Sequence, residues 1–196
     1  YHIVYCYDFM YLPWGDKKTI QFITNVGLIT SDGPHGRNIM AAEWTHHVSY
    51  SPGLIAVCVG FGKATLENIQ KTKEFGINLC SAEQNILSGV AGGASGKDID
   101  KIGALEELGF KFHQGKKIKS LMVEGAALNA ECKLVKHITL GDHVMLVGEV
   151  VEASVSGGEP LAYHKGLYWK MDKTIEKPSE KVRARIKAVV EKHRKN

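Results

Sequence analysis

The chain has 196 residues, and 25 lysines and arginines against 21 aspartates and glutamates give it a formal net charge of +4. A composition of 44% hydrophobic and 23% charged residues is typical of a soluble globular domain and excludes a disordered chain. No apolar run approaches the roughly 18 residues that span a bilayer, and the small basic excess does not indicate a nucleic-acid partner. We therefore expect one globular domain over residues 1–196.

The four cysteines, Cys6, Cys58, Cys80 and Cys132, are widely spaced and form no CxxC pair. Three of them lie within apolar runs of strand length, where buried free thiols are common. This usage is typical of a reducing compartment, and we expect a cytoplasmic protein without disulfide bonds. No histidine or cysteine has partners at the spacing of metal ligands, so no metal site is predicted.

The first part of the chain is rich in aromatic residues. Tyr5, Tyr7, Phe9 and Tyr11 alternate along the sequence, which predicts a half-exposed strand or an arm over residues 1–20 that packs onto another surface. Residues 22–30 form the first clear strand, closed by a turn rich in glycine and proline at residues 31–36.

Residues 54–59 (LIAVCV) predict a strand buried on both faces, because they form a continuous apolar run with β-branched members. The run ends at the turn Gly60, Phe61 and Gly62, and a helical pattern follows. A helix start presents free backbone N–H groups and a positive dipole end, and Lys63 and Thr65 lie beside it. A phosphate site and an ordinary turn without a ligand are both compatible with this pattern.

Residues 83–109 predict a helical insertion in two parts, 83–91 and 98–108. The segment between them resembles a Walker phosphate loop but does not match the motif. Ala91 stands where the motif has its first glycine, and Asp98 follows Lys97 where the motif has serine or threonine. No GxGxxG segment follows a strand, so a Rossmann domain is not predicted.

Two long alternating runs, residues 125–140 and 143–156, flank a Gly-Asp turn and predict a hairpin. Strands this long favour a closed barrel, because closure removes exposed edges. Ser179 is a natural N-cap for a last helix over residues 178–193, whose lysines and arginines we interpret as a solvated face. The predicted fold class is mostly β with peripheral helices.

Several short motifs occur in a fixed order along the chain, and their number and order are more specific than any one alone. They are LITS at 28–31, GRN at 36–38, NIMAAEW at 38–44, SYSP at 49–52, KAT at 63–65, FGIN at 75–78, SGKDIDK at 95–101, GDH at 141–143, VGEV at 147–150 and YW at 168–169. Over residues 22–169 the chain thereby resembles the flavin reductase-like, FMN-binding split-barrel proteins, particularly the flavoredoxin-type branch.

The resemblance implies an antiparallel split β-barrel of Greek-key type and a homodimer with FMN near its interface. It implies an NAD(P)H-dependent flavin or ferric reductase, in which hydride passes from NADH or NADPH to flavin N5. Two alternatives remain open: an FMN-carrying electron-transfer protein that does not oxidise nicotinamide, and a barrel that has lost flavin and serves as an interaction module.

The predicted cofactor-binding residues combine the helix-start turn with positions carried over from the family. They are Asn38, Met40, Ala41, Ala42, Glu43, Trp44, Ser49, Gly60, Phe61, Gly62, Lys63, Thr65, Asn68, Lys97 and Tyr168. Trp44 is either the wall of the flavin ring or a packing aromatic. No catalytic residue is assigned, and Lys97 and His143 are the candidates: Lys97 for charge near the reduced flavin, and His143 for orienting the nicotinamide or capping a strand.

Two positions depart from the family pattern. Ala41 stands where relatives usually carry threonine or serine, and Glu43 stands where the residue is often small. Residue 41 therefore offers the flavin no side-chain hydrogen bond, which leaves the flavin potential and the reductase activity open while FMN binding is still expected.

Overall fold

The structure is a computed structural model that describes residues 10–194. The predicted aromatic alternation falls mostly on residues 1–9, outside the described part, and Tyr11 is exposed. A short 3-10 helix, η1 (Thr19–Gln21), precedes the first strand. Among the described residues, no helix has both the length and the apolar composition needed to cross a membrane.

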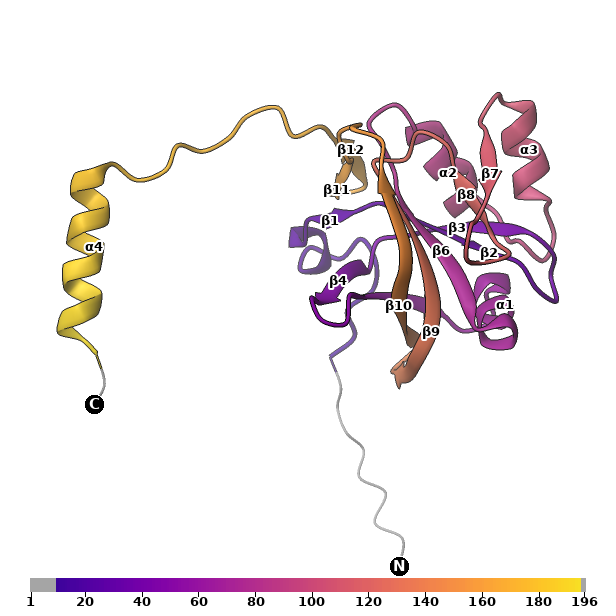
Figure 1. The fold of residues 1–196 in the computed structure, drawn as a ribbon, viewed down its shortest axis with the longest axis horizontal. Coiled ribbons are helices and arrows are strands. Elements are labelled where there is room, and N and C mark those ends of the chain that lie inside the picture. Colours follow the sequence, from indigo (N-terminus) through magenta and orange to yellow (C-terminus); the bar gives the residue numbers. More distant parts are fainter. Residues whose placement is uncertain (1–9, 195–196) are drawn as a thin grey trace, which may run out of the picture.

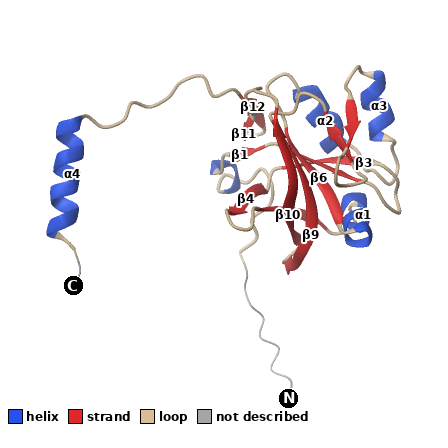
Figure 2. Cartoon of the chain, viewed as in Figure 1, coloured by secondary structure: helices blue, strands red, loops and turns tan. Residues whose placement is uncertain are grey.

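Seven antiparallel strands form the central sheet (Figures 1 and 2). In spatial order they are β3 (Asn38–Ala42), β2 (Gly27–Ser31), β6 (Glu74–Leu79), β9 (Leu128–Leu140), β10 (His143–Val155), β5 (Leu54–Gly60) and β4 (Thr45–Ser49). The two edge strands, β3 and β4, follow each other in the sequence and are joined only by Glu43 and Trp44. A link this short requires the sheet to curl until its edges meet, which confirms the predicted split barrel.

Two smaller sheets flank the barrel. One contains β1 (Thr24–Asn25), β11 (Ala162–His164) and β12 (Leu167–Trp169), and the other contains β7 (Phe112–Gln114) and β8 (Leu121–Val123). The predicted strand over residues 22–30 is therefore divided at Val26: β1 pairs with β11, whereas β2 pairs with β3 and β6. The chain changes sheets at this residue, and its carbonyl accepts a hydrogen bond from the N–H of Cys80.

The four α-helices of the described residues lie outside the sheet: α1 (Ala64–Thr72), α2 (Asn85–Gly93), α3 (Lys101–Glu107) and α4 (Glu180–Lys192). The predicted helical insertion and C-terminal helix are both confirmed. Ser179 caps α4 by accepting a hydrogen bond from the N–H of Val182. Figure 1 shows α4 set apart from the barrel at the end of an extended connection, and none of its residues is buried.

Both faces of the central sheet are covered. On β2, Ile29 belongs to the core inside the barrel together with Phe75 and Leu146, whereas its neighbour Leu28 packs with Leu87 of α2 on the other side. Successive strand residues point to opposite faces, so a strand between two cores is buried on both faces. This is why all five residues of β2 are buried.

Candidate functional site

The turn between β5 and α1 exposes unpaired backbone donors. Gly62 adopts φ 77°, which suits glycine, and Lys63 is the N-cap of α1 but makes no capping bond with its side chain. In the described part of the chain, the N–H groups of Ala64 and Thr65 have no acceptor. These donors and the positive end of the helix dipole favour an anion here, and the exposed Lys63 adds a positive charge.

Asn38, at the start of β3, connects to this turn. Its Nδ2 donates to the buried Thr65 Oγ1 at 2.8 Å. Its Oδ1 is buried and has no hydrogen-bond partner among the described residues. The following loop passes closely over it, because a Cβ at Gly96 would lie only 2.1 Å from Asn38 Oδ1. Since buried polar atoms are nearly always paired, this orphan oxygen indicates a polar group that the chain itself does not supply.

Lys101 brings a second cation to the same region; it ends the SGKDIDK motif but is not among the predicted cofactor-binding residues. Its side chain is buried, and its Nζ donates to the carbonyl oxygens of Ala91 and Ala94 at 3.0 and 3.3 Å, where α2 ends. Burial lowers the pKa of Lys101 to about 8, with the charge of Lys63 as a second cause. A buried ammonium paired only with carbonyl oxygens retains most of its attraction for an anion.

A cleft of about 300 Å³ lies at the other end of β3. It is lined by Trp14, Asn25, Val26, Ala41, Ala42, Glu43, Ser88, Gly89, Gly92, Tyr163 and Tyr168. Small side chains open it between β3 and α2, because a Cβ at Gly92 would lie 3.3 Å from that of Ala41. The cleft can therefore accept a flat apolar group against the end of β3.

Two tyrosines form the aromatic wall of this cleft. The rings of Tyr163 and Tyr168 are 5.5 Å apart between centroids, and the hydroxyl of Tyr168 donates to Ser88 Oγ at 3.1 Å. Burial raises the pKa of Tyr163, and the charges of Glu43 and Tyr168 act in the same direction. Glu43 thus places its carboxylate close to the aromatic wall.

β3 joins the anion-binding turn to the cleft. Asn38 stands at one end of the strand and Ala42 at the other, and five strand residues extend over about 13 Å. Because β3 is an edge strand, paired only with β2 in the described chain, one row of its backbone N–H and C=O groups is free. The arrangement suits an elongated ligand with an anionic end, a planar ring, and donors and acceptors along one edge of that ring.

The structure places Trp44 and His143 together, outside the lining of the cleft. Their ring centroids are 4.6 Å apart, and Trp44 is 53% exposed. His143 Nδ1 lies 2.7 Å from Asp142 Oδ1, and this hydrogen bond with His143 lowers the pKa of the Asp142 carboxyl. Gly60 lies beside the imidazole, since a Cβ there would be 3.6 Å from His143 Nε2. His143 is therefore a neighbour of the anion-binding turn.

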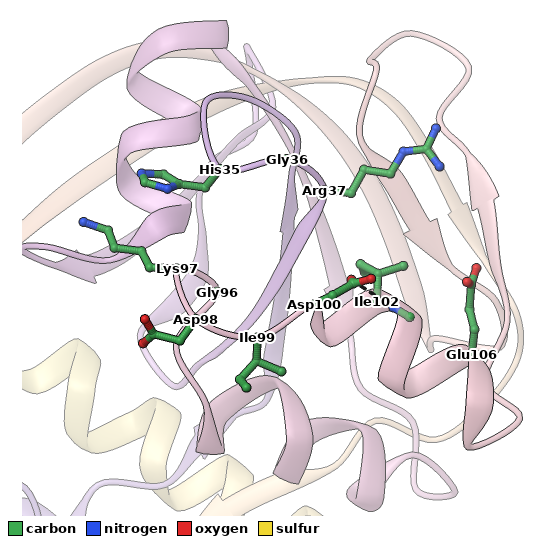
Figure 3. Close-up of a pocket in the computed structure, with 11 residues that line it drawn as sticks. His35, Gly36, Arg37, Gly96, Lys97, Asp98, Ile99, Asp100, Ile102 and Glu106 are labelled. Atoms are coloured by element: carbon green, nitrogen blue, oxygen red, sulfur yellow. Dashed lines mark hydrogen bonds between the residues drawn. The ribbon is translucent and has the colours of Figure 1, made fainter.

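Lys97 lies in a second cavity, of about 490 Å³, between the β2–β3 turn and α3 (Figure 3). This cavity shares no lining residue with the cleft. The carboxylate of Glu67 binds both Lys97 Nζ and His35 Nε2, each at 2.5 Å. Hydrogen bonds from Lys97 and from His35 lower the pKa of the Glu67 carboxyl. The charge of Lys97 is thus balanced within the chain, by a carboxylate in the first turn of α1.

Three other predicted residues have roles inside the fold or lie apart from both cavities. Asn68 is fully buried; it donates to Ser31 Oγ and to the carbonyl of Gly36 and accepts from the N–H of His35. Met40 packs against the barrel core. Ser49 ends β4 and lines neither cavity. Among residues 10–194, no group of three or more histidine, cysteine, aspartate or glutamate side chains is arranged to hold a metal ion.

Comparison with known proteins agrees with this geometry. Residues 20–171 match the model of the flavin reductase like domain. An uncharacterised protein of Archaeoglobus fulgidus is 32% identical over 119 residues, which are 60% of this chain and 64% of that protein. The NADH-dependent FMN reductase AsuE2 of Streptomyces nodosus subsp. asukaensis is 29% identical over 147 residues, which are 74% of this chain and 77% of that protein.

Solved structures show the same fold. The flavin reductase PheA2 superimposes with a TM-score of 0.68 at 26% identity, over 80% of this chain and 95% of that one. The flavoredoxin of Methanosarcina acetivorans gives a TM-score of 0.72 at 22% identity, over 83% of this chain and 92% of that one. The family match covers most of the chain and includes β3, the turn before α1 and the aromatic wall. The chain belongs to the flavin reductase-like family.

Proposed function

We propose that the protein is an FMN-binding NAD(P)H-dependent flavin or ferric reductase, in which residues 1–196 form one FMN-binding domain. The observation that carries the proposal is β3, an edge strand that runs from an unpaired set of donors at α1 to a cleft with an aromatic wall. FMN has the matching parts in the matching order: a phosphate, a flexible chain and a planar ring. Relatives named as NADH-dependent FMN reductases support the same assignment.

FMN held at this site would supply the redox chemistry, namely hydride acceptance from NADH or NADPH and electron transfer to free flavin, iron(III) or a partner protein. The chain supplies binding and orientation. The N–H groups of Ala64 and Thr65 and the charges of Lys63 and Lys101 hold the phosphate. Asn38 Oδ1 accepts a hydrogen bond from the ligand, which resolves its lack of a partner.

The free backbone edge of β3 binds the pyrimidine side of the ring, because its donors and acceptors alternate along the strand. At residue 41 the backbone alone is available, since alanine offers no hydroxyl. Tyr163 and Tyr168 then form the wall of the ring. His143, hydrogen-bonded to Asp142 and in a tilted ring contact with Trp44, is the candidate for orienting the nicotinamide.

The second candidate function is an FMN-carrying electron-transfer protein without nicotinamide oxidation, and Ala41 favours it because the ring lacks a tuning hydroxyl there. Anaerobic titration of the yellow holoprotein with NADH and with NADPH separates the two functions. Bleaching of the flavin absorbance by either nucleotide supports the reductase. Absence of bleaching by both nucleotides supports the electron carrier. A colourless protein that takes up no added FMN contradicts both.

Lys63→Ala tests the phosphate site. We expect its affinity for FMN to fall about tenfold or more, because a charge-assisted hydrogen bond contributes roughly 1.5–3 kcal/mol. Lys71→Ala is the matched control: Lys71 is an exposed lysine in the last turn of the same helix. Isothermal titration of the flavin-free proteins gives the dissociation constants. Unchanged affinity in the Lys63 variant contradicts the phosphate assignment.

A further inference from the structure

Trp14 lies at the mouth of the ring cleft although it precedes residues 20–171, which match the family model. Its indole Nε1 donates to Glu43 Oε1 at 2.7 Å, across 29 residues of sequence. Trp14 is 73% exposed, so it rests on the rim of the cleft and is not part of the core. The family match therefore does not account for this residue.

The turn that carries Trp14 is ordered by its own hydrogen bonds. The N–H of Asp16 donates to the carbonyl of Pro13 at 3.1 Å, and Gly15, the third residue of the turn, has φ 83°. These features define a type II turn with Trp14 as its second residue. The hydroxyl of Thr19 lies 2.9 and 3.0 Å from the carbonyl oxygens of Pro13 and Asp16. The turn thus holds the backbone of Trp14 in place beside the cleft.

Glu43 accepts the hydrogen bond that holds the indole of Trp14 at the cleft. It is the only carboxylate among the described residues that line the cleft, and it belongs to the link between β3 and β4. Because the indole N–H occupies one of its oxygens, Trp14 is connected directly to the segment that shapes the cleft. The contact is a single hydrogen bond between partly exposed side chains, so it can open and close.

We propose that Trp14 is a specificity-determining residue of the flavin site: a cap, held by Glu43, that slows the exit of the flavin ring and limits which planar molecules reach it. The inference rests on the proposed function, because it needs the ring in this cleft. The cap provides an aromatic face on the solvent side, opposite the end of β3. Bulky electron acceptors must displace it, whereas the flavin beneath it is retained.

The rate of FMN dissociation tests the cap without relying on turnover. Diluted holoprotein releases FMN, and the recovery of flavin fluorescence gives the rate constant. We expect Trp14→Ala to release FMN about 3- to 10-fold faster, the range set by the loss of one aromatic contact. Trp169→Ala is the matched control, because Trp169 is also exposed, also donates through its indole, to the carbonyl of His164, and does not line the cleft. This control should release FMN at the wild-type rate.

Two further substitutions isolate the attachment. Glu43→Ala removes the acceptor and should release FMN about as fast as Trp14→Ala, whereas Glu43→Gln, which keeps an oxygen acceptor without the charge, should release FMN at an intermediate rate. If both Trp14→Ala and Glu43→Ala release FMN at the wild-type rate, the cap is refuted and the proposed function stands. If wild-type protein binds no FMN, the proposed function fails, and the cap fails with it.

Discussion

Lys101 is a buried lysine whose surroundings lower its pKa. Its ammonium contacts two carbonyl oxygens and lies near the charge of Lys63, so the folded protein favours its neutral form more than water does. The pKa falls from 10.5 in the unfolded chain to about 8 in the folded protein. Between these values the unfolded chain holds the proton that the native state has released, so Lys101 makes the unfolding free energy increase with pH.

Lys101→Met is therefore expected to stabilise the flavin-free protein at pH 7, by roughly 1–3 kcal/mol, since one pKa unit corresponds to about 1.4 kcal/mol. The gain should shrink as the pH rises from 8 towards 10.5, because the wild-type protein then loses the unfavourable charge. Urea unfolding at pH 7 and at pH 10 measures the gain in unfolding free energy at each pH, with Lys71→Met as the exposed control. The same variant should bind FMN more weakly at pH 7. A gain independent of pH would contradict the assigned pKa.

For single residues, the sequence predicts the roles of those whose interaction partners lie nearby in the chain. Lys63 and Thr65 follow from the helix start, and Ser179 follows from its capping position. Lys101 looks like a surface lysine of a helix, because its carbonyl partners belong to another segment. Trp14 meets a carboxylate 29 residues away, and no sequence spacing encodes that contact. Such roles depend on tertiary packing, which local patterns do not report.

Among the elements, β10 of the β9–β10 hairpin packs closely against the barrel core at Gly148. Its register shifts between Val147 and Gly148, and a Cβ at Gly148 would lie 2.6 Å from Phe75 Cζ and 2.7 Å from Cys132 Cβ. The bulge and the missing side chain together let the strand bend over the barrel core.

Gly148→Ala should therefore lower the free energy of unfolding by about 1–3 kcal/mol, because the added methyl overpacks a fixed core. Gly53→Ala is the matched control, since a Cβ at Gly53 meets nothing within 4 Å. Thermal unfolding followed by circular dichroism compares the two variants. Equal melting temperatures would show that the core yields to the extra methyl.

The elements themselves were largely predictable. Periodicity gave the hairpin at residues 125–140 and 143–156, and the structure has β9 at Leu128–Leu140 and β10 at His143–Val155. The division of the first strand at Val26 was not predictable, because pairing with β11 depends on residues 160 and beyond. An alternating run indicates that a segment forms a strand, but it does not indicate which sheet the strand joins.

For the whole molecule, we propose a cytoplasmic homodimer with FMN near the interface. Exposed apolar side chains on and beside β4 and β5 support it: Trp44, Val48 and Phe61 are each more than half exposed. Apolar side chains gathered in this way on a protein surface mark interaction sites.

Val48→Glu should shift the protein towards monomer in sedimentation velocity and weaken FMN retention, because a charge at a packed interface loses its hydration. Val155→Glu is the matched control: Val155 is 77% exposed and ends β10 at the opposite end from His143. If the Val48 variant keeps the sedimentation coefficient of the wild type, the interface lies elsewhere.

The order of strands also determines when the barrel can be completed during synthesis. β3, β2 and β6 form one half of the sheet and β5 with β4 the other, and only β9 and β10 bridge them. When residues 27–79 have left the ribosome, the strands of both halves are present, but β9 and β10, which join the halves, are not. These residues already include Asn38, Lys63 and Thr65. The halves come together only after residue 155 is available, so the pocket for the cofactor is among the last features of the nascent chain to form.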